Sequence, residues 1–226
     1  RRPGTCTMRP IATTTLVLTV LVGEHVAVNG GVQQSQSRYR FPPQELGLLE
    51  SPDRDAWQRP NEIMDALNIA DGSTVADFGA GGGWFAIRLA RRVGPNGRVY
   101  AVDFRPEMIS GLDRRIAREQ LTNVIAVRAR PDDAQLPSRQ VDAIVIVNSY
   151  AALPAPVPLL RSLTEALRPG GRLGVVDFHP SGGGPGPPPG NRVDPSQVIR
   201  DAREAGLRVR AEVDDLPYQF VVVLEP

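Results

Sequence analysis

Four small or acidic residues alternate with single intervening residues in the run VADFGAGGGWF, residues 75–85. They are Asp77, Gly79, Gly81 and Gly83, and they follow an apolar segment directly. Glycines have no Cβ atom, so a bound molecule can approach the backbone closely at such a turn. A helix that begins after the turn points its free N–H groups at the ligand. The run therefore predicts a ligand site at a strand-to-helix turn.

The dinucleotide fingerprint G-x-G-x-x-G is the alternative interpretation of this run. Counted from Gly79, it is satisfied at Gly81 but meets Trp84 where the third glycine is required. The match fails, which disfavours a nicotinamide-dependent oxidoreductase.

The pattern that fits is acidic-x-Gly-x-Gly-x-Gly, and with it the chain resembles the class I S-adenosylmethionine-dependent methyltransferases. In that family this loop wraps the amino acid part of the cofactor. The resemblance implies S-adenosylmethionine as cofactor. It also implies a cofactor-binding role for the residues of the loop, which are Asp77, Gly79, Ala80, Gly81 and Gly83.

A second carboxylate, Asp103, lies twenty residues beyond Gly83, at the end of a predicted strand over 98–102. In nucleotide sites of this topology, such a residue accepts hydrogen bonds from both ribose hydroxyls. The alternative, a solvated turn carboxylate, is less favoured by this position. Phe104 follows, and two interpretations stay open for it: stacking on adenine or packing in the core.

The loop PDDAQLP, residues 131–137, follows a predicted strand over 124–128. In the resembling family an acidic residue of this loop contacts the adenine amino group. Asp132 and Asp133 both qualify, and the sequence does not separate them. The contact would be a charge-assisted hydrogen bond, roughly twice as strong as a neutral one. An acidic surface turn is the alternative for each.

Candidates for the acceptor side follow the predicted fourth strand, 141–147. Ligands of open α/β sheets bind beyond the carboxyl ends of the strands, so the next residues, Asn148 to Tyr150, should face the pocket. We predict a cofactor contact for Asn148. Tyr150 and His179 are the candidate general bases, with Asp177 behind them. The alternative for His179 is a solvated loop residue.

The closest resemblance is to small bacterial methyltransferase-like proteins with an exported leader, a Trp-Gln-x-Pro segment and a Leu-Pro-Tyr-Gln ending. Here these segments are residues 57–60 and 216–219. A histidine often follows the tyrosine after strand four in that group, whereas this chain has Ala151. The departure is compatible with a second hypothesis, a non-catalytic module that binds S-adenosylmethionine. The first remains methyl transfer to an unidentified, small-molecule acceptor.

Predicted strands and helices alternate along the chain, and LRPGGRL at 167–173 is a second motif that the family shows before its fifth strand. The alternation predicts an α/β fold: a doubly wound, mostly parallel, seven-stranded Rossmann-like sheet with an antiparallel C-terminal strand. The predicted strands also include 172–178, 208–213 and 219–224. The predicted helices are 86–93, 106–120, 158–167 and 195–205.

Two segments could cover the site. Residues 51–70 are predicted to form an N-terminal lid helix with Pro60 in its first turn. Trp57 and Arg59 are candidate lid residues; the alternative is that Trp57 packs this helix against the sheet. The Gly/Pro-rich segment 181–191 is either a mobile flap or a linker.

The chain has 226 residues, 41% of them hydrophobic, and a net charge of +1. This size predicts one methyltransferase domain, 36–226, after an extension, 1–35. The near-zero charge predicts no nucleic acid partner. Cys6 and His25 both fall in the extension, which leaves His179 as the domain's histidine and predicts no metal site.

The extension has the layout of a secretory signal peptide: Arg9, an apolar run at 11–22, and small residues at 29–31. The run is short for a bilayer span, so we expect no stable membrane insertion after leader removal. The protein is then exported or periplasmic. The alternative is a cytoplasmic protein with an N-terminal tail, which the cytoplasmic synthesis of S-adenosylmethionine favours.

Overall fold

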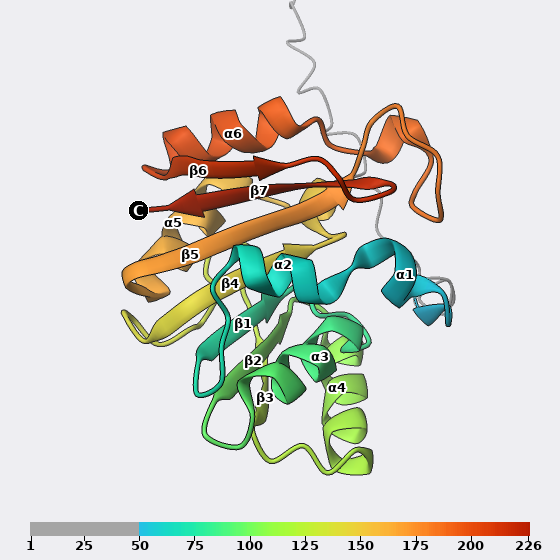
Figure 1. Cartoon of the computed structure of the whole chain (residues 1–226). Helices are drawn as coiled ribbons and strands as arrows, with labels where there is room; N and C mark the ends of the chain where they lie inside the picture. Colours follow the sequence, from blue (N-terminus) through green and yellow to red (C-terminus); the bar gives the residue numbers. More distant parts are fainter. Residues whose placement is uncertain (1–49) are drawn as a thin grey trace, which may run out of the picture. The chain divides into compact units, whose positions relative to one another are not determined.

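The structure, a computed structural model, describes residues 50–226 (Figure 1). The predicted leader, 1–35, and the first residues of the predicted methyltransferase domain, 36–49, lie outside the described residues.

Seven strands form one sheet in the order β3-β2-β1-β4-β5-β7-β6. The pairs from β3 to β5 are parallel, and β7 is antiparallel to both of its neighbours. This confirms the predicted mostly parallel sheet with one antiparallel strand near the C-terminus. The strands are β1 (Thr74–Phe78), β2 (Arg98–Asp103), β3 (Val124–Arg128), β4 (Val141–Val147), β5 (Leu167–Phe178), β6 (Arg208–Val213) and β7 (Gln219–Glu225).

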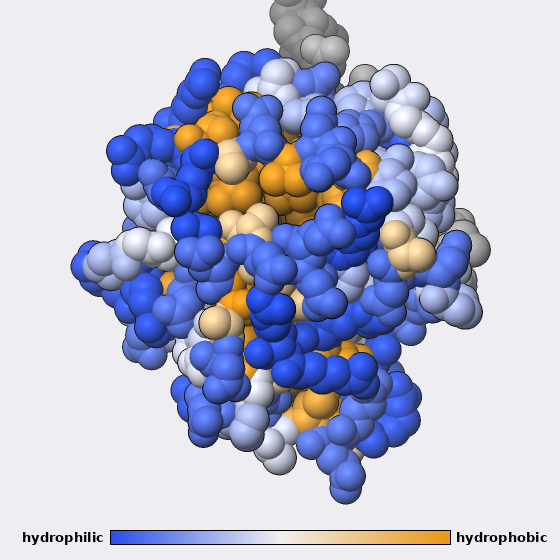
Figure 2. Space-filling model, in the orientation of Figure 1, coloured by the Kyte–Doolittle hydropathy of each residue, from blue (hydrophilic) through white to orange (hydrophobic). Residues whose placement is uncertain are grey.

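Helices cover both faces of the sheet, and each face has its own hydrophobic core. One core holds side chains of α2, α3 and α4, and the other holds those of α5 and α6. The outer face over α2 and α3 is largely hydrophilic (Figure 2). The helices are α1 (Arg54–Gln58), α2 (Pro60–Ala66), α3 (Trp84–Val93), α4 (Pro106–Arg118), α5 (Pro156–Ala166) and α6 (Pro195–Glu204), with short 3-10 turns η2 (Tyr150–Ala152) and η3 (Pro189–Asn191).

The continuous apolar run at residues 143–147 of β4 follows from this double coverage. Ile144 and Ile146 belong to the core under α5 and α6, whereas Val145 and Val147 belong to the core under α2 and α3. Successive residues of a strand point to opposite faces, so a strand buried on both faces needs apolar residues throughout.

Strand β5 begins earlier than the predicted residue 172. Leu167 pairs with Val141, and the next pair is Arg172 with Ala143. The residues between them, which include Gly170 at φ 81°, form an irregular insertion in the ladder. The motif LRPGGRL therefore both ends α5 and starts β5, a combination that hydrophobic periodicity does not reveal.

The segment predicted as one lid helix consists of two short helices, α1 and α2. Arg59 separates them with φ 46°, in the left-handed region. A proline disfavours the helical conformation of the residue before it, which explains the break ahead of Pro60. Pro60 is the first residue of α2, as predicted.

Candidate cofactor and acceptor site

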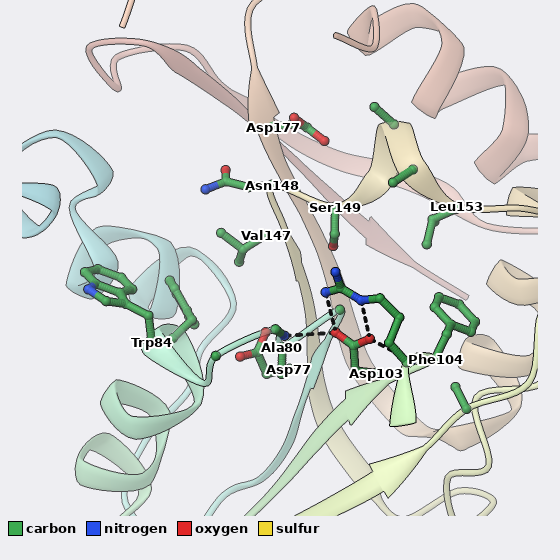
Figure 3. Close-up of a pocket in the computed structure, with 18 of the residues that line it drawn as sticks. Asp77, Ala80, Trp84, Asp103, Phe104, Val147, Asn148, Ser149, Leu153 and Asp177 are labelled. Atoms are coloured by element: carbon green, nitrogen blue, oxygen red, sulfur yellow. Dashed lines mark hydrogen bonds and ion pairs between the residues drawn. The ribbon is translucent and has the colours of Figure 1, made fainter. Parts of the chain in front are cut away.

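A cavity of about 720 Å³ lies at the carboxyl ends of β1, β2, β4 and β5 (Figure 3). Its volume is within the range of roughly 300–1,000 Å³ of small-molecule pockets. Asp77 and Asp103 lie on one side of it, and Asp177 lies on the other, with Asn148 and Ser149 between them. The cavity thus has two ends with different chemistry.

The glycine turn forms part of the first end. Gly79 and Gly81 line the cavity with φ 81° and 54°. The N–H groups of Gly79 and Ala80 donate to the carbonyl of Val102, at 2.8 and 2.9 Å, so the turn is fixed to the end of β2. A Cβ atom on Gly79 would lie 2.8 Å from the Cβ of Ser149 and still closer to its Oγ. The turn therefore has no room for a side chain at residue 79.

Gly83 does not line this cavity. It precedes α3 with φ 84°, and a Cβ there would lie 2.8 Å from Leu112 Cδ2 of α4. In this structure the third glycine of the pattern lets α3 and α4 pack closely.

Asp77 and Arg54 form a buried pair of opposite charge beside the turn. The Asp77 side chain is buried, and its Oδ2 has no hydrogen-bond partner. Burial raises the pKa of Asp77 to about 7, opposed chiefly by the charge of Arg54. Burial lowers the pKa of Arg54 to about 9, and its guanidinium lies 3.9 Å from the centre of the Trp84 ring. Both residues line the cavity.

Three amide side chains hold Arg54 in place. Its Nε and Nη2 donate to Gln58 Oε1 at 3.1 and 2.9 Å. Gln58 donates to Gln219, Gln219 donates to Asn148, and Asn148 Nδ2 donates back to Gln58 Oε1 at 3.3 Å. The glutamines of Trp-Gln-x-Pro and Leu-Pro-Tyr-Gln thus meet in one buried network at the end of β4.

The sequence did not indicate Arg54 as a site residue. Trp57, the predicted lid residue, is outside the lining; it packs on Phe178 and Tyr218 at ring distances of 5.8 and 6.4 Å. Arg59 is also outside the lining and donates to the carbonyl of Asp215 at 3.3 Å. The packing alternative therefore describes Trp57, and the contribution of this segment to the cavity comes from Arg54 together with Glu50.

Asp103 lies at the end of β2, as predicted, and four hydrogen bonds converge on its carboxylate. Oδ2 accepts from the N–H of Gly81 at 3.0 Å and from Arg105 Nη2 at 3.3 Å. Oδ1 accepts from the Arg105 N–H at 3.0 Å and from Arg105 Nε at 3.1 Å. Arg105, which the sequence did not indicate as a site residue, therefore bonds both oxygens of the carboxylate and also lines the cavity.

Phe104 lines the cavity and also packs edge-on against Phe78 of the core, at a ring distance of 5.3 Å. Its two interpretations are compatible in this position. Neither Asp132 nor Asp133 is among the residues that line the cavity, although Pro131 and Gln135 of the same loop are, so their contact with adenine stays a prediction. The Asp133 carboxylate instead accepts from the N–H of Gln135 at 2.8 Å and from the hydroxyl of Ser162 at 3.3 Å.

The two predicted bases are also outside the lining. The Tyr150 side chain is buried, and its hydroxyl donates to Asp201 Oδ2 on α6 at 2.9 Å. His179 Nε2 lies 3.6 Å from Asp214 Oδ1, and its ring packs against Phe220. The expectation that Tyr150 faces the pocket is therefore wrong, whereas Asn148 and Ser149 line the cavity as expected and Ala151 lines it as well.

Replacing Tyr150 with phenylalanine tests this correction. The change removes one buried hydrogen bond to Asp201, which keeps its bond from Gln197. We expect the free energy of unfolding to fall by about 1–2 kcal/mol, measured by urea denaturation. We expect the affinity for S-adenosylhomocysteine to stay unchanged. Unchanged stability combined with lost methyl transfer would instead support a role for Tyr150 as a base.

The Gly/Pro-rich segment lines the second end of the cavity through Pro187 and Asn191. Arg192 ties this segment together: its guanidinium donates to the carbonyl oxygens of Pro187, His179 and Gly182 at 2.7, 2.9 and 2.6 Å. A Cβ on Gly186 would lie 2.5 Å from the Phe178 ring, so this glycine lets the segment lie flat on the aromatic face. The segment is thus packed in place in this structure.

Within residues 50–226, no cluster of three His, Cys, Asp or Glu side chains could hold a metal ion. None of the helices in this range combines the length and apolar character of a membrane span.

Comparison with known proteins agrees with this geometry. Residues 75–171 match the family model described as a methyltransferase domain. The ubiquinone/menaquinone biosynthesis C-methyltransferase of Pseudomonas entomophila is 31% identical over 123 residues, which are 54% of this chain and 47% of that protein. The protein-L-isoaspartate O-methyltransferase of Methanothrix thermoacetophila is 32% identical over 146 residues, 60% of this chain and 67% of that protein.

Among solved structures, an S-adenosylmethionine-dependent methyltransferase from Aquifex aeolicus aligns with a TM-score of 0.77 and 28% identity, over 82% of this chain and 98% of that one. The chain spans about half the length of the first of the curated relatives above. The glycine turn, the sheet order and these matches agree with one another. The chain belongs to the class I S-adenosylmethionine-dependent methyltransferases, and S-adenosylmethionine is its cofactor.

Proposed function

We propose that this protein transfers a methyl group from S-adenosylmethionine to a small-molecule acceptor. The observation that carries the proposal is the single cavity that joins the glycine turn, with Asp77 and Asp103, to a second end at β4 and β5. Two reactants held in one cavity can be aligned for in-line displacement, so positioning supplies much of the acceleration.

The first end of the cavity fits the amino acid part of the cofactor. That part is a zwitterion with one ammonium and one carboxylate group. Asp77 presents a buried carboxylate oxygen without a hydrogen-bond partner, and Arg54 presents a buried guanidinium beside it. The unbonded oxygen of Asp77 is costly to bury, so a ligand that donates a hydrogen bond to it is favoured here. We assign the ammonium to Asp77 and the carboxylate to Arg54.

The end of β2 fits the ribose. Asp103 can accept hydrogen bonds from two neighbouring hydroxyls, and in this proposal the Arg105 guanidinium moves aside to let them approach. Phe104 and Pro131 line the cavity next to it and offer apolar contact to the adenine ring. Gly79, Ala80 and Gly81 provide the close backbone approach in between.

The bound cofactor supplies a methyl group that its sulfonium activates. The protein's own residues hold the two reactants and exclude water: Pro187 and Asn191 line the second end, and Leu153 and Pro154 add apolar wall. One relative is named for quinone biosynthesis and another for a protein substrate. The volume of the cavity, about 720 Å³, is that of a small-molecule pocket, which favours the small-molecule class over a protein segment.

Calorimetry with S-adenosylhomocysteine, NAD and 5′-methylthioadenosine tests this assignment. S-Adenosylhomocysteine should bind, NAD should not, and 5′-methylthioadenosine, which lacks the amino acid end, should bind at least about tenfold more weakly than S-adenosylhomocysteine. In Arg54→Met this difference should shrink, because the carboxylate loses its partner. Equal binding of both compounds by the unchanged protein would contradict the zwitterion site.

Transfer itself is tested by incubating the protein with S-adenosylmethionine labelled in its methyl group and a small-molecule extract of bacterial cells. We expect the label to enter a compound that passes a protein-retaining filter. Binding of S-adenosylhomocysteine without any transfer would favour the non-catalytic module, and transfer only into retained material would favour a macromolecular acceptor.

Asp103→Ala should weaken S-adenosylhomocysteine binding by about 1–3 kcal/mol, the range for leaving a polar partner unpaired. The matched variant is Arg105→Ala, which removes the group that competes with the ribose for the same oxygens. Arg105→Ala should bind S-adenosylhomocysteine at least as tightly as the unchanged protein does. Isothermal titration of both variants decides: equal losses in the two would mean that Asp103 acts only through its bond to Arg105.

A further inference from the structure

Asp177 is a buried carboxylate at the second end of the cavity. It lies near the end of β5, lines the cavity, and has a relative exposure of 2%. Its Oδ1 accepts the N–H of Phe178 at 2.8 Å, whereas its Oδ2 has no hydrogen-bond partner. Burial of such an oxygen without a partner is costly, so the site is prepared for a ligand that donates to it.

The walls around Asp177 are mostly apolar. Ala151, Ala152 and Leu153 follow β4, and Pro187 comes from the Gly/Pro-rich segment. In Figure 3 Asp177 lies apart from Asp77 and Asp103, so the groups assigned to the cofactor leave it free for a second molecule. Ala151 carries only a methyl group, so Asp177 is the ionisable side chain among these wall residues.

Asp177 is ionised near neutral pH. Burial raises its pKa to about 6. The N–H groups of Phe178, Ala151 and Tyr150 oppose this shift, as does the charge of Arg192 beyond the Gly/Pro-rich segment. Above about pH 6 the group is therefore a carboxylate, and it can accept either a hydrogen bond or a proton.

We propose that Asp177 binds the head group of the methyl acceptor, and that the acceptor is a small, largely apolar molecule whose head group carries a hydroxyl, enol or amine hydrogen. The inference rests on the proposed methyl transfer and names the acceptor class for that same cavity. An acidic head group is excluded, because it would place a second negative charge beside a buried carboxylate.

The transfer step then balances without a further reactant. A lone pair of the head-group atom forms the new bond to the methyl carbon, and the carbon–sulfur bond breaks with its electron pair remaining on sulfur. The head-group hydrogen passes as a proton to Asp177 Oδ2 and then to solvent. Asp177 thus positions the acceptor before transfer and takes its proton during transfer.

Three probes with one ring and different head groups test the proposal: benzylamine, benzyl alcohol and benzoate. Each is titrated at about pH 8 into the full chain saturated with S-adenosylhomocysteine, with ligand-observed NMR as readout. We expect the amine and the alcohol to bind at least about tenfold more tightly than benzoate, the effect of roughly one hydrogen bond to a charged group. The affinity for benzylamine should fall as the pH is lowered through about 6.

Asp177→Asn keeps the shape of the side chain and removes its charge. In this variant the three probes should bind within about threefold of one another, because the difference of about 1.4 kcal/mol or more that the charge supplies is lost. The matched control is Asp201→Asn, a buried aspartate outside the cavity lining that bonds Tyr150, and it should keep the order of the probes. S-Adenosylhomocysteine affinity reports separately on folding and on the cofactor site.

Two results would overturn the proposal. One is the absence of any preference among the probes in the unchanged protein, including the case in which none binds. The other is a preference that survives in Asp177→Asn while S-adenosylhomocysteine still binds. Loss of S-adenosylhomocysteine binding by the unchanged protein would instead count against the proposed methyl transfer, so the two failures are distinct.

Discussion

Replacing Gly79 with alanine is expected to weaken S-adenosylhomocysteine binding by at least about tenfold, since an added carbon in a closely packed position costs about 1–3 kcal/mol. Two costs act together at this residue. Its φ of 81° is in the left-handed region, which costs a residue with a Cβ atom about 1–2 kcal/mol. The new Cβ would also meet Ser149, so either the turn or the end of β4 has to move, and both line the cavity.

Gly72→Ala is the matched control for this change. Gly72 has φ 78°, nearly the same conformation, but a Cβ there meets nothing within 4 Å, and the residue does not line the cavity. The backbone conformation should cost both variants about 1–2 kcal/mol in the free energy of unfolding, and Gly79→Ala should lose more because of its conflict with Ser149. Only Gly79→Ala should lose the ligand, as measured by calorimetry at a temperature where both are folded. Equal affinities in the two variants would show that the turn tolerates a side chain.

The sequence predicted those parts of the fold that depend on local pattern. The apolar run of β4 correctly predicted a strand, because a strand that is covered on both faces needs apolar residues on both. The turn at Gly94 correctly predicted the end of α3. The position of Asp103 at the end of β2 also predicted that it lies beside the glycine turn. In a parallel sheet, the carboxyl ends of neighbouring strands meet at one edge.

The residues that the sequence missed reach the cavity through long side chains. Arg54 precedes β1 by a helix and a turn, and no periodicity shows that its guanidinium lies beside Asp77 and over Trp84. Arg105 follows Asp103 directly, so the sequence shows the neighbour but not the folded-back conformation that bonds it. Such contacts depend on rotamers, which the order of residues leaves open.

The error at the end of β4 has a different cause. The rule that ligands bind beyond the strand ends placed three consecutive residues in the pocket, but the chain enters the 3-10 turn η2 at Tyr150. This turn directs the tyrosine to Asp201 on α6 and leaves Ala151 and Ala152 in the cavity lining. The base candidates were therefore chosen by position along the strand, whereas the turn decides which side chains face the ligand.

The amide network links the two motifs that suggested the closer resemblance. Gln58 comes from the N-terminal segment and Gln219 from the antiparallel strand β7, and both are fully buried. Each bonds the other and, through Asn148 and Arg54, the cavity. Buried polar groups of this kind are expensive unless every member is bonded, so the motifs make physical sense only as a set. Together the two motifs fix the position of Arg54.

Binding of S-adenosylhomocysteine is expected to release a proton and to tighten as the pH rises from about 5.5 to 7. Burial raises the pKa of Asp77 from 3.8 to about 7, so the carboxyl group of the ligand-free protein is largely protonated at the lower end of this interval and about half protonated at its upper end. In our assignment the ligand's ammonium stabilises the ionised form, which lowers the pKa in the complex. The free protein then holds more protons than the complex, and affinity must increase with pH by linkage.

The number of protons released sets how steeply the dissociation constant depends on pH. Release of one full proton changes the dissociation constant at most about tenfold per pH unit, or 1.36 kcal/mol. Calorimetry in two buffers of different ionisation enthalpy counts the protons directly. Asp77→Asn should remove both the proton release and the pH dependence, whereas Asp177→Asn, with its carboxyl at the other end of the cavity, should keep them. Proton uptake on binding would show that Asp77 is not ionised in the complex and would remove the basis for pairing it with the ammonium.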